Sequence, residues 1–162
     1  MDNQQGKICE LDIAWLAGFL DGEGSICMMK TNANRFRLNG QPVSGWVPRI
    51  TIANTHKPTL ERLVFIVEGL NLPHNICWRY PKNSRWKESW HLSAQGMKRF
   101  IRWADVLERY TFTKREQFFT ARCYCQSRLQ HCVRDPLTPY EDFMLQKFLT
   151  HKIPQRLNAL KV

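Results

Sequence analysis

The sequence predicts an α+β fold in which two pairs of antiparallel strands alternate with helices, in the order α-ββ-α-ββ-α-α-α. Two kinds of pattern carry this prediction: apolar and polar residues alternate beside turn residues, and apolar residues at helical spacing fill the segments between. The chain has 162 residues, of which 43% are hydrophobic and 12% aromatic, which excludes a disordered basic tail. We expect one domain over residues 1–162.

The first predicted element is a helix over residues 8–20, ended by the glycines of Asp21-Gly-Glu-Gly24. Its residues 13–20 are apolar around the whole circumference, so every side requires a cover. Ala14, Gly18 and Gly22 form a line of small residues that lets another backbone approach closely. Two interpretations are possible. The helix packs against neighbours within the same chain, as an ordinary core helix does, or against a second copy of the chain.

Two long strands are predicted next, over residues 25–38 and 46–53, joined by the hairpin signal Asn39-Gly-Gln-Pro42. A shorter pair, over residues 76–80 and 89–93, flanks a basic loop at residues 81–87. Helices are predicted over residues 58–70, 96–107, 113–129 and 139–150. The inward parity of the strands is apolar and comprises Ile26, Met28, Trp46, Pro48, Ile50, Ile52, Ile76, Trp78, Trp90 and Leu92.

The net charge of the chain limits the classes of partner that it is expected to bind. The formal net charge is +10 and the pI about 9.6, which favours nucleic acid, an anionic membrane surface or an acidic protein as partner. The longest apolar run, residues 13–20, is too short to span a bilayer, and the polar start does not resemble a signal peptide. We therefore expect an intracellular, reducing compartment, either a bacterial cytoplasm or an organelle, with all six cysteines as thiols.

A zinc site at the cysteines is disfavoured. Cys123 and Cys125 stand two residues apart in a predicted helix, where side chains diverge by about 200°. The sequence contains no Cys-x-x-Cys pair. Buried thiols account for these cysteines better.

Two acids end the first helix, Asp21 and Glu23, where the helix dipole favours cations instead. If two such helices pair, their Glu23 carboxylates also meet and repel each other. A divalent cation would relieve both conflicts, because carboxylate, carbonyl and phosphate oxygens are the ligands that Mg²⁺ takes. The alternative is a solvated acidic turn without a ligand.

The segment Leu16-Ala-Gly-Phe-Leu-Asp-Gly-Glu-Gly24 resembles the signature of the LAGLIDADG homing endonucleases. One copy of the motif in a chain of this length resembles the homodimeric branch of that family. The resemblance implies an α-ββ-α-ββ-α LAGLIDADG fold with extra C-terminal helices, dimerised through Ala14, Gly18 and Gly22, whose antiparallel sheets form a saddle over the DNA major groove. It also implies a homing endonuclease that makes a double-strand break in a long pseudo-palindromic site.

The resemblance assigns roles to single residues. Glu23 falls on the metal-binding acid, Gly22 on the position whose carbonyl faces a metal, and Asp21 on an acid that is mostly structural. Asn54 matches the residue that positions water, and Lys114 matches the lysine before the last core helix. The implied cofactor is Mg²⁺, which Mn²⁺ or Ca²⁺ can replace for binding, and neither a small-molecule cofactor nor a membrane is implied.

Two departures from the family pattern are visible. Glu23 stands where Asp is also common, and Pro58, with Lys57 beside it, stands where some relatives carry a further basic residue. Without the resemblance, a surface lysine remains an alternative for Lys114 and a strand-end turn remains an alternative for Asn54. With it, a lysine can stabilise the charge of a pentavalent phosphate, and an asparagine can hold water but cannot act as a base.

The outward face of the strands is the expected DNA-binding surface, because a two-stranded ribbon fits the major groove. Its expected members are Cys27, Met29, Thr31, Arg35, Arg37, Arg49, Thr51, Arg79 and His91. Lys82, Arg85 and Lys87 in the basic loop are expected to contact phosphates. A basic face that is merely solvated is the alternative.

Two other functions remain open. A maturase-like splicing cofactor or DNA-binding regulator would keep the fold and the basic face without cleavage, although the presence of Glu23, Asn54 and Lys114 argues against it. A monomeric scaffold would use the first helix as plain core.

Overall fold

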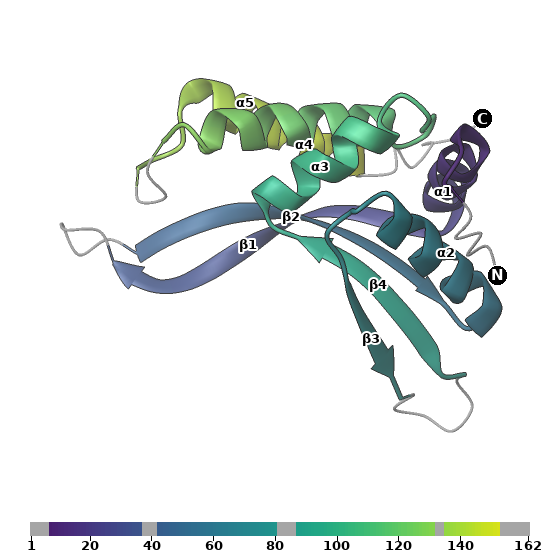
Figure 1. Ribbon diagram of the computed structural model, residues 1–162. Coiled ribbons are helices and arrows are strands. Elements are labelled where there is room, and N and C mark those ends of the chain that lie inside the picture. Colours follow the sequence, from purple (N-terminus) through teal and green to yellow (C-terminus); the bar gives the residue numbers. More distant parts are fainter. Residues whose placement is uncertain (1–6, 37–41, 81–86, 132–134, 153–162) are drawn as a thin grey trace, which may run out of the picture.

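The computed structural model describes residues 7–36, 42–80, 87–131 and 135–152, and the side chains of residues 32–36, 42–44 and 151–152 lie outside this description. The predicted α+β class and element order are confirmed (Figure 1). The elements are α1 (Glu10–Glu23), β1 (Gly24–Phe36), β2 (Pro42–Asn54), α2 (Lys57–Gly69), β3 (Asn75–Arg79), β4 (Ser89–Gln95), α3 (Met97–Leu107), α4 (Arg115–Arg128) and α5 (Pro139–Lys152).

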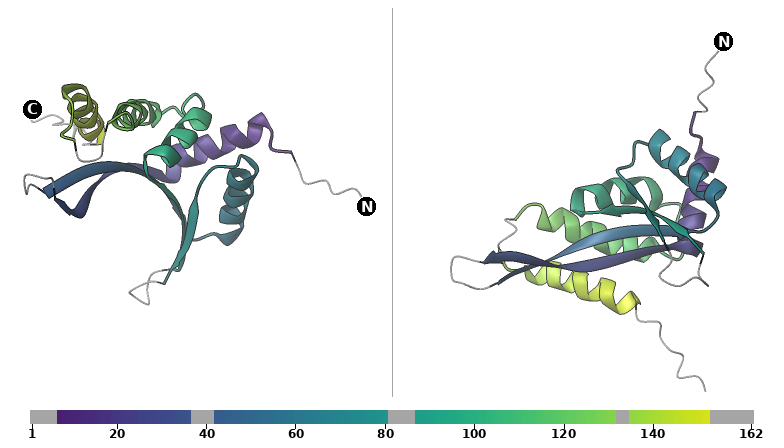
Figure 2. Two further views of the ribbon diagram at one scale, coloured as in Figure 1. Left: turned by 60° about the vertical axis from the view of Figure 1, so that its left-hand side comes forward. Right: turned by 90° about the horizontal axis from the view of Figure 1, so that it is seen from below.

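The four strands form one antiparallel sheet in the order β1-β2-β4-β3. Cross-strand pairs keep the predicted parity, since Ile26 lies opposite Ile50, and Ile50 lies opposite Ala94. The sheet curves into an arch whose outer side carries the helices and whose inner side is open (Figure 2). The sequence pattern thus divides the sheet into a covered convex face and an open concave face.

One hydrophobic core lies between the convex face and the helices. Ile50, Ile52 and Leu92 of the sheet are fully buried, as are Phe100 and Trp103 of α3. The indole N–H of Trp103 donates to the carbonyl of Pro73 at 2.9 Å, which satisfies its polar atom inside the core. The prediction of inward residues holds best for β1, β2 and β4, whereas Ile76 and Trp78 of the edge strand β3 each remain 41% exposed.

The C-terminal helices extend this core over the outer part of β1 and β2. The α5 helix packs along α4 (Figure 1), where Phe148 and Leu145 of α5 are buried. A buried ion pair joins Arg128 of α4 to Glu141 of α5, with Nη1 and Oε2 3.2 Å apart. Glu141 also accepts the backbone N–H of Thr138 at 2.9 Å, so its charge is compensated from two sides.

The predicted end of the first helix is wrong. Instead of stopping at Leu20, α1 continues through Gly22 to Glu23, and β1 starts directly at Gly24. A Cβ at Gly24 would lie 2.7 Å from the carbonyl oxygen of Leu20, so the direct passage from helix to strand requires glycine at this position. The two acids therefore lie within the last turn of a regular helix.

The remaining boundaries differ from the predicted ones by a few residues. The largest difference is in β2, which begins at Pro42 because its backbone already pairs with Phe36 of β1. Pro58 lies in the first turn of α2, where the missing N–H has no intrahelical acceptor to lose.

Candidate functional site

One face of α1 has no cover within the described part of the chain. Leu11 is 80% exposed and Trp15 is 40% exposed, and Ala14, Gly18 and Gly22 are exposed beside them. A Cβ added at Gly18 or Gly22 would meet no atom within 4 Å. The small residues are therefore not required by packing within the chain, and the core-helix alternative is wrong for this face.

Asp21 connects the end of α1 to the start of α4. Its carboxylate accepts three backbone N–H groups, from Phe112 at 2.6 Å, Thr113 at 3.2 Å and Lys114 at 3.1 Å. Burial alone would raise the pKa of Asp21, but these hydrogen bonds together with that of the Thr113 side chain outweigh it and hold the pKa below its ordinary value. Asp21 thus fixes the turn that precedes α4, and its position at the negative end of α1 no longer needs a metal as explanation.

Lys114 makes the reciprocal contact. Its ammonium group donates to the backbone carbonyl of Asp21, in the last turn of α1, where helix carbonyls lack an intrahelical partner. Burial lowers the pKa of Lys114, and the Asp21 carboxylate partly opposes that shift. The lysine is therefore a half-buried group fixed at the end of α1 and not a free surface side chain.

Glu23 differs from both neighbours, since it is exposed and has no hydrogen bond or ion pair within the described residues. It lines a hollow of about 250 Å³ together with Ala53, Asn54, Thr55 and Ser89. The β2–β4 pairing brings these residues together, because Asn54 lies opposite Trp90 at the same end of the sheet. The fold thus places Glu23 and Asn54, predicted from distant segments, at one site.

Asn54 has one defined contact. Its Oδ1 accepts the backbone N–H of His56 at 2.7 Å, which closes the turn between β2 and α2. Its amide nitrogen is the group left to donate to a water or a phosphate. The turn and the water-positioning role are therefore compatible in one side chain.

The donor chemistry at Glu23 fits a magnesium ion that is completed by substrate. No group of three or more His, Cys, Asp or Glu side chains comes together in the residues that the structure describes. The chain itself offers the Glu23 carboxylate and nearby backbone carbonyls, which are hard oxygen donors in a low number. Mg²⁺ typically accepts one or two protein carboxylates and takes its remaining oxygens from water and phosphates.

The concave face carries the predicted polar residues in register. Cys27 of β1 lies opposite Arg49 of β2, Met29 opposite Val47, and Ala53 of β2 opposite His91 of β4. Thr31, Thr51 and Arg79 share the same parity, and Lys87 is exposed just before β4. Arg37, Lys82 and Arg85 lie outside the described residues, as does the side chain of Arg35.

Two polar atoms on this face lack partners within the described part. Arg49 Nε and His91 Nδ1 are buried and accept or donate no hydrogen bond there. His91 Nε2 lies 3.0 Å from the hydroxyl of Ser89. Burial lowers the pKa of His91, and the positive charges of Arg79 and Arg49 lower it further. The unsatisfied Nε of the Arg49 guanidinium and Nδ1 of the His91 imidazole are thus left for a polar ligand on this face.

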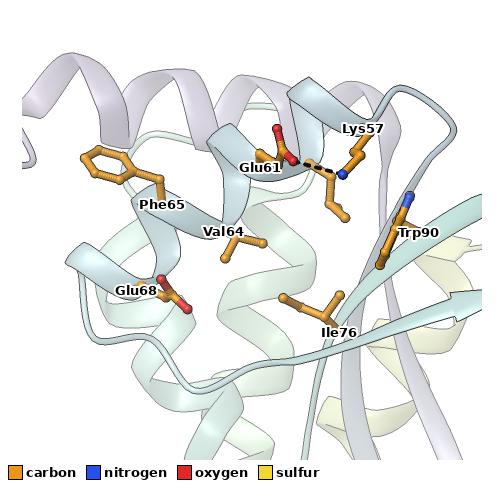
Figure 3. A pocket seen from close by; sticks show the side chains of 8 residues that line it. Lys57, Glu61, Val64, Phe65, Glu68, Ile76 and Trp90 are labelled. Atoms are coloured by element: carbon orange, nitrogen blue, oxygen red, sulfur yellow. Dashed lines mark ion pairs between the residues drawn. The ribbon is translucent and has the colours of Figure 1, made fainter.

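Lys57 does not join Glu23. Its ammonium pairs with Glu61, one turn along α2, at 3.6 Å (Figure 3). Its side chain lines a separate pocket between α2 and the sheet, whose lining does not include Glu23. Pro58 contributes no polar side-chain atom. The further basic residue that some relatives carry thus has no counterpart at this position.

Several polar residues of the site were not predicted from the sequence. Ser89 lines the Glu23 hollow, and Ser25, Asn75, Ser93 and Gln95 share the concave parity. Ser25 and Ser93 have the parity of Cys27 and His91, so the alternation of side chains along a strand could have predicted them. Ser89 required knowledge that β4 pairs with β2.

No protein-family model and no curated protein match the sequence, whereas many solved structures resemble the fold. The homing endonuclease I-CvuI, crystallised with a DNA target in 2 mM Mg and the DNA not cleaved, has a TM-score of 0.65 and 17% identity over 91% of this chain and 85% of that chain. The archaeal intron-encoded homing endonuclease I-Vdi141I, complexed with DNA, has a TM-score of 0.57 and 14% identity over 88% of this chain and 97% of that chain.

A longer structure matches over part of its length. The LAGLIDADG meganuclease I-CpaMI, bound to uncleaved DNA, has a TM-score of 0.56 and 18% identity over 92% of this chain but 45% of that chain. This chain is therefore similar to nearly all of some of these proteins and to about half of another. Among the described helices, none is long and apolar enough to cross a membrane.

Proposed function

We propose that this chain, which has the fold of the LAGLIDADG homing endonucleases, is a site-specific DNA endonuclease that acts as a homodimer and requires Mg²⁺. Each subunit would cut one strand of a long pseudo-palindromic site. The main supporting observation is the Glu23 carboxylate, which is exposed at the Asn54 hollow and has no bonded partner within the described residues. It lies at the end of the uncovered face of α1, and Lys114 is fixed at the carbonyl of Asp21 in the same turn.

The concave face supports duplex DNA as the substrate. Antiparallel strands present alternate side chains to base edges in the major groove, and arginine is the side chain that most often binds guanine with two hydrogen bonds. Arg49 and Arg79 lie on this face, and the chain carries a net charge of +10. Exposed Lys87 is suited to a phosphate contact.

The chain's own residues divide the chemistry among them. Glu23, with the backbone carbonyl of Gly22, would hold Mg²⁺, which supplies electrostatic stabilisation of the phosphate charge. Asn54 donates from its amide nitrogen and orients a water without accepting its proton. Lys114, fixed by the Asp21 carbonyl, places a positive charge beside the reacting phosphate.

The exposed face of α1 supports the proposed homodimer. Leu11, Trp15 and the small residues Ala14, Gly18 and Gly22 form a patch that lets two backbones approach closely. Parallel pairing of two α1 helices about a two-fold axis brings both Glu23 residues to the centre of one continuous concave face. Cutting both strands then requires both copies.

Plasmid cleavage tests the proposal. A supercoiled plasmid library, or the uninterrupted host-gene sequence across the insertion point, is incubated with the purified chain and increasing MgCl₂. We expect linear product that requires Mg²⁺, and Glu23→Gln should bind the same DNA without cutting it. Asp142→Asn, an exposed acid-to-amide change on α5, is the matched control and should cut normally. A binding module without nuclease activity would instead retard the DNA and never cut it at any Mg²⁺ concentration.

A further inference from the structure

Ser89, the first residue of β4, lines the Glu23 hollow of about 250 Å³. Ala53 of β2 lines it as well and lies opposite His91, two residues from Ser89 on β4. Ala53, Ser89 and His91 therefore share the concave parity, so the hollow opens on the face proposed to bind DNA. A serine at a strand end is commonly just solvated, so Ser89 gains a role only through what fixes its hydroxyl.

The imidazole of His91 fixes this hydroxyl. Its Nε2 lies 3.0 Å from Ser89 Oγ, and both side chains are half-buried. Its Nδ1 is buried and has no hydrogen-bond partner in the part of the chain that the structure describes, so Ser89 is the ring's one partner there. His91 lies toward the middle of the sheet, whereas the hollow lies at its end, beside Asn54. The hydroxyl thus stands between a fixed ring and an open space.

The chemistry of a phosphate determines which group donates. A neutral imidazole has one N–H donor and one acceptor nitrogen, and a hydroxyl both donates and accepts. The ring is neutral at pH 7, because burial and the charges of Arg79 and Arg49 lower the pKa of His91 from its ordinary value of 6.5. A phosphodiester oxygen only accepts hydrogen bonds. A serine beside a phosphate must therefore donate to it, and its oxygen is then free to accept the Nε2–H of His91.

We propose that the Ser89 hydroxyl donates to a non-bridging oxygen of the reacting phosphate, and that the Nε2–H of His91 holds it in that direction. This inference deepens the proposed endonuclease function and rests on it. Ser89 contacts the substrate itself, whereas His91 is a positioning residue that acts through Ser89. Asn54 of β2 and Lys114 before α4 supply the other side-chain donors, so the hydroxyl adds a neutral donor from a third segment.

Single-turnover cleavage tests the role of Ser89. The substrate is a duplex with the site that wild type linearises, and the full chain is in saturating excess with MgCl₂. Ser89→Ala should lower the rate about tenfold or more, because one donor to the phosphate charge is lost. Ser89→Thr keeps the hydroxyl and should stay within about threefold of wild type. A wild-type rate for Ser89→Ala would overturn the proposal.

Binding and a matched serine variant separate this role from a structural one. Without Mg²⁺, fluorescence anisotropy should give Ser89→Ala a DNA affinity within about threefold of wild type, since the loss falls on the rate at saturation. Ser127→Ala on α4, whose hydroxyl donates to Glu141 at 3.4 Å, is the control and should cut normally. A rate loss that disappears at saturating chain concentration would mean that Ser89 only binds DNA, and would overturn the proposal.

A double-mutant cycle tests whether His91 acts through Ser89. His91→Leu should lower the rate about fivefold in the wild-type chain, and less than about twofold when Ser89 is already alanine. His91→Gln retains an N–H donor near the position of Nε2 and should recover most of the rate. Equal losses in both backgrounds would contradict the positioning role.

The tautomer of His91 gives a readout other than cleavage. The Glu23→Gln chain, labelled with ¹⁵N-histidine and bound to the same duplex, should show His91 with its proton on Nε2, and His91→Gln assigns the signal. A proton on Nδ1 alone would overturn the proposal. If wild type cuts and Ser89→Ala cuts equally fast, this inference fails and the proposed function stands. If wild type never cuts DNA, both fail.

Discussion

Asp21 and Glu23 stand two residues apart on the last turn of α1, yet their surroundings are opposite. Asp21 accepts three backbone N–H groups from the turn that precedes α4, whereas Glu23 faces an open hollow with no bonded partner in the described residues. From sequence both acids conflict equally with the helix dipole. The structure resolves the conflict for Asp21 through hydrogen bonds from the turn at residues 112–114, and leaves only Glu23 available to a ligand.

The comparison predicts its largest effect at Glu23. Glu23→Gln should lower the single-turnover cleavage rate by about 10³-fold or more, about 4 kcal/mol in activation free energy, because the anionic ligand is lost. The free energy of unfolding should change by less than about 0.5 kcal/mol, since the side chain is exposed and unpaired. Urea denaturation and a cleavage time course measure the two quantities. A variant that loses stability and keeps activity would reverse the assignment of the two acids.

A smaller effect is expected at Lys114. Lys114→Met keeps the length of the side chain and removes its charge, so the cleavage rate should fall about 10²-fold. DNA affinity, measured by fluorescence anisotropy without Mg²⁺, should change little. Lys114→Arg restores the charge and should recover part of the rate, whereas a purely structural lysine would give the same rate for both variants.

Asp21→Asn should affect stability more than chemistry. The amide offers one acceptor oxygen without charge, so the free energy of unfolding should fall by about 1–2 kcal/mol, because the hydrogen bonds from the turn are weakened. The cleavage rate at 20 °C should fall less than it does for Lys114→Met. Thermal and urea denaturation measure the loss. An unchanged stability would mean that the three N–H groups bind water equally well.

The smallest effect is a difference in acid stability. Hydrogen bonding holds the folded-state pKa of Asp21 below its unfolded value of about 3.9, so its stabilisation is complete above about pH 4 and disappears as the pH falls through the folded-state pKa. Wild type and Asp21→Asn should therefore differ most near neutral pH and converge in acid. Urea denaturation between pH 2.5 and pH 7 measures this convergence. A constant difference over that range would exclude Asp21 as the titrating group.

The element order could be predicted from the sequence because strand alternation and helical spacing are local signals. The inward parity of Ile26, Ile50 and Leu92 followed from the same signals. The end of α1 was predicted wrongly because Gly22 suggested a helix stop. Contacts from residues 112–114, about ninety positions away, support that last turn, and no local pattern reports them.

Some residues of the candidate site could likewise be predicted from the sequence, and others could not. Glu23 stood out through its motif, and Asn54 and Lys114 through a resemblance to known relatives. Ser89 was missed because its place depends on the pairing of β2 with β4 across a separation of more than thirty residues. The pocket between α2 and the sheet was also invisible, since it is formed by residues that a pattern rule assigns to the core.

The long antiparallel strands have a spacing that matches duplex DNA. Same-face residues on a strand repeat about every 6.8 Å, and stacked base pairs repeat about every 3.4 Å. Side chains on β1 and β2 can therefore fall on every second base pair, and a cross-strand pair such as Cys27 and Arg49 lies at the same level along the two strands. A substitution at one concave-face position would then alter preference over one or two base pairs and leave the rest of the target unchanged.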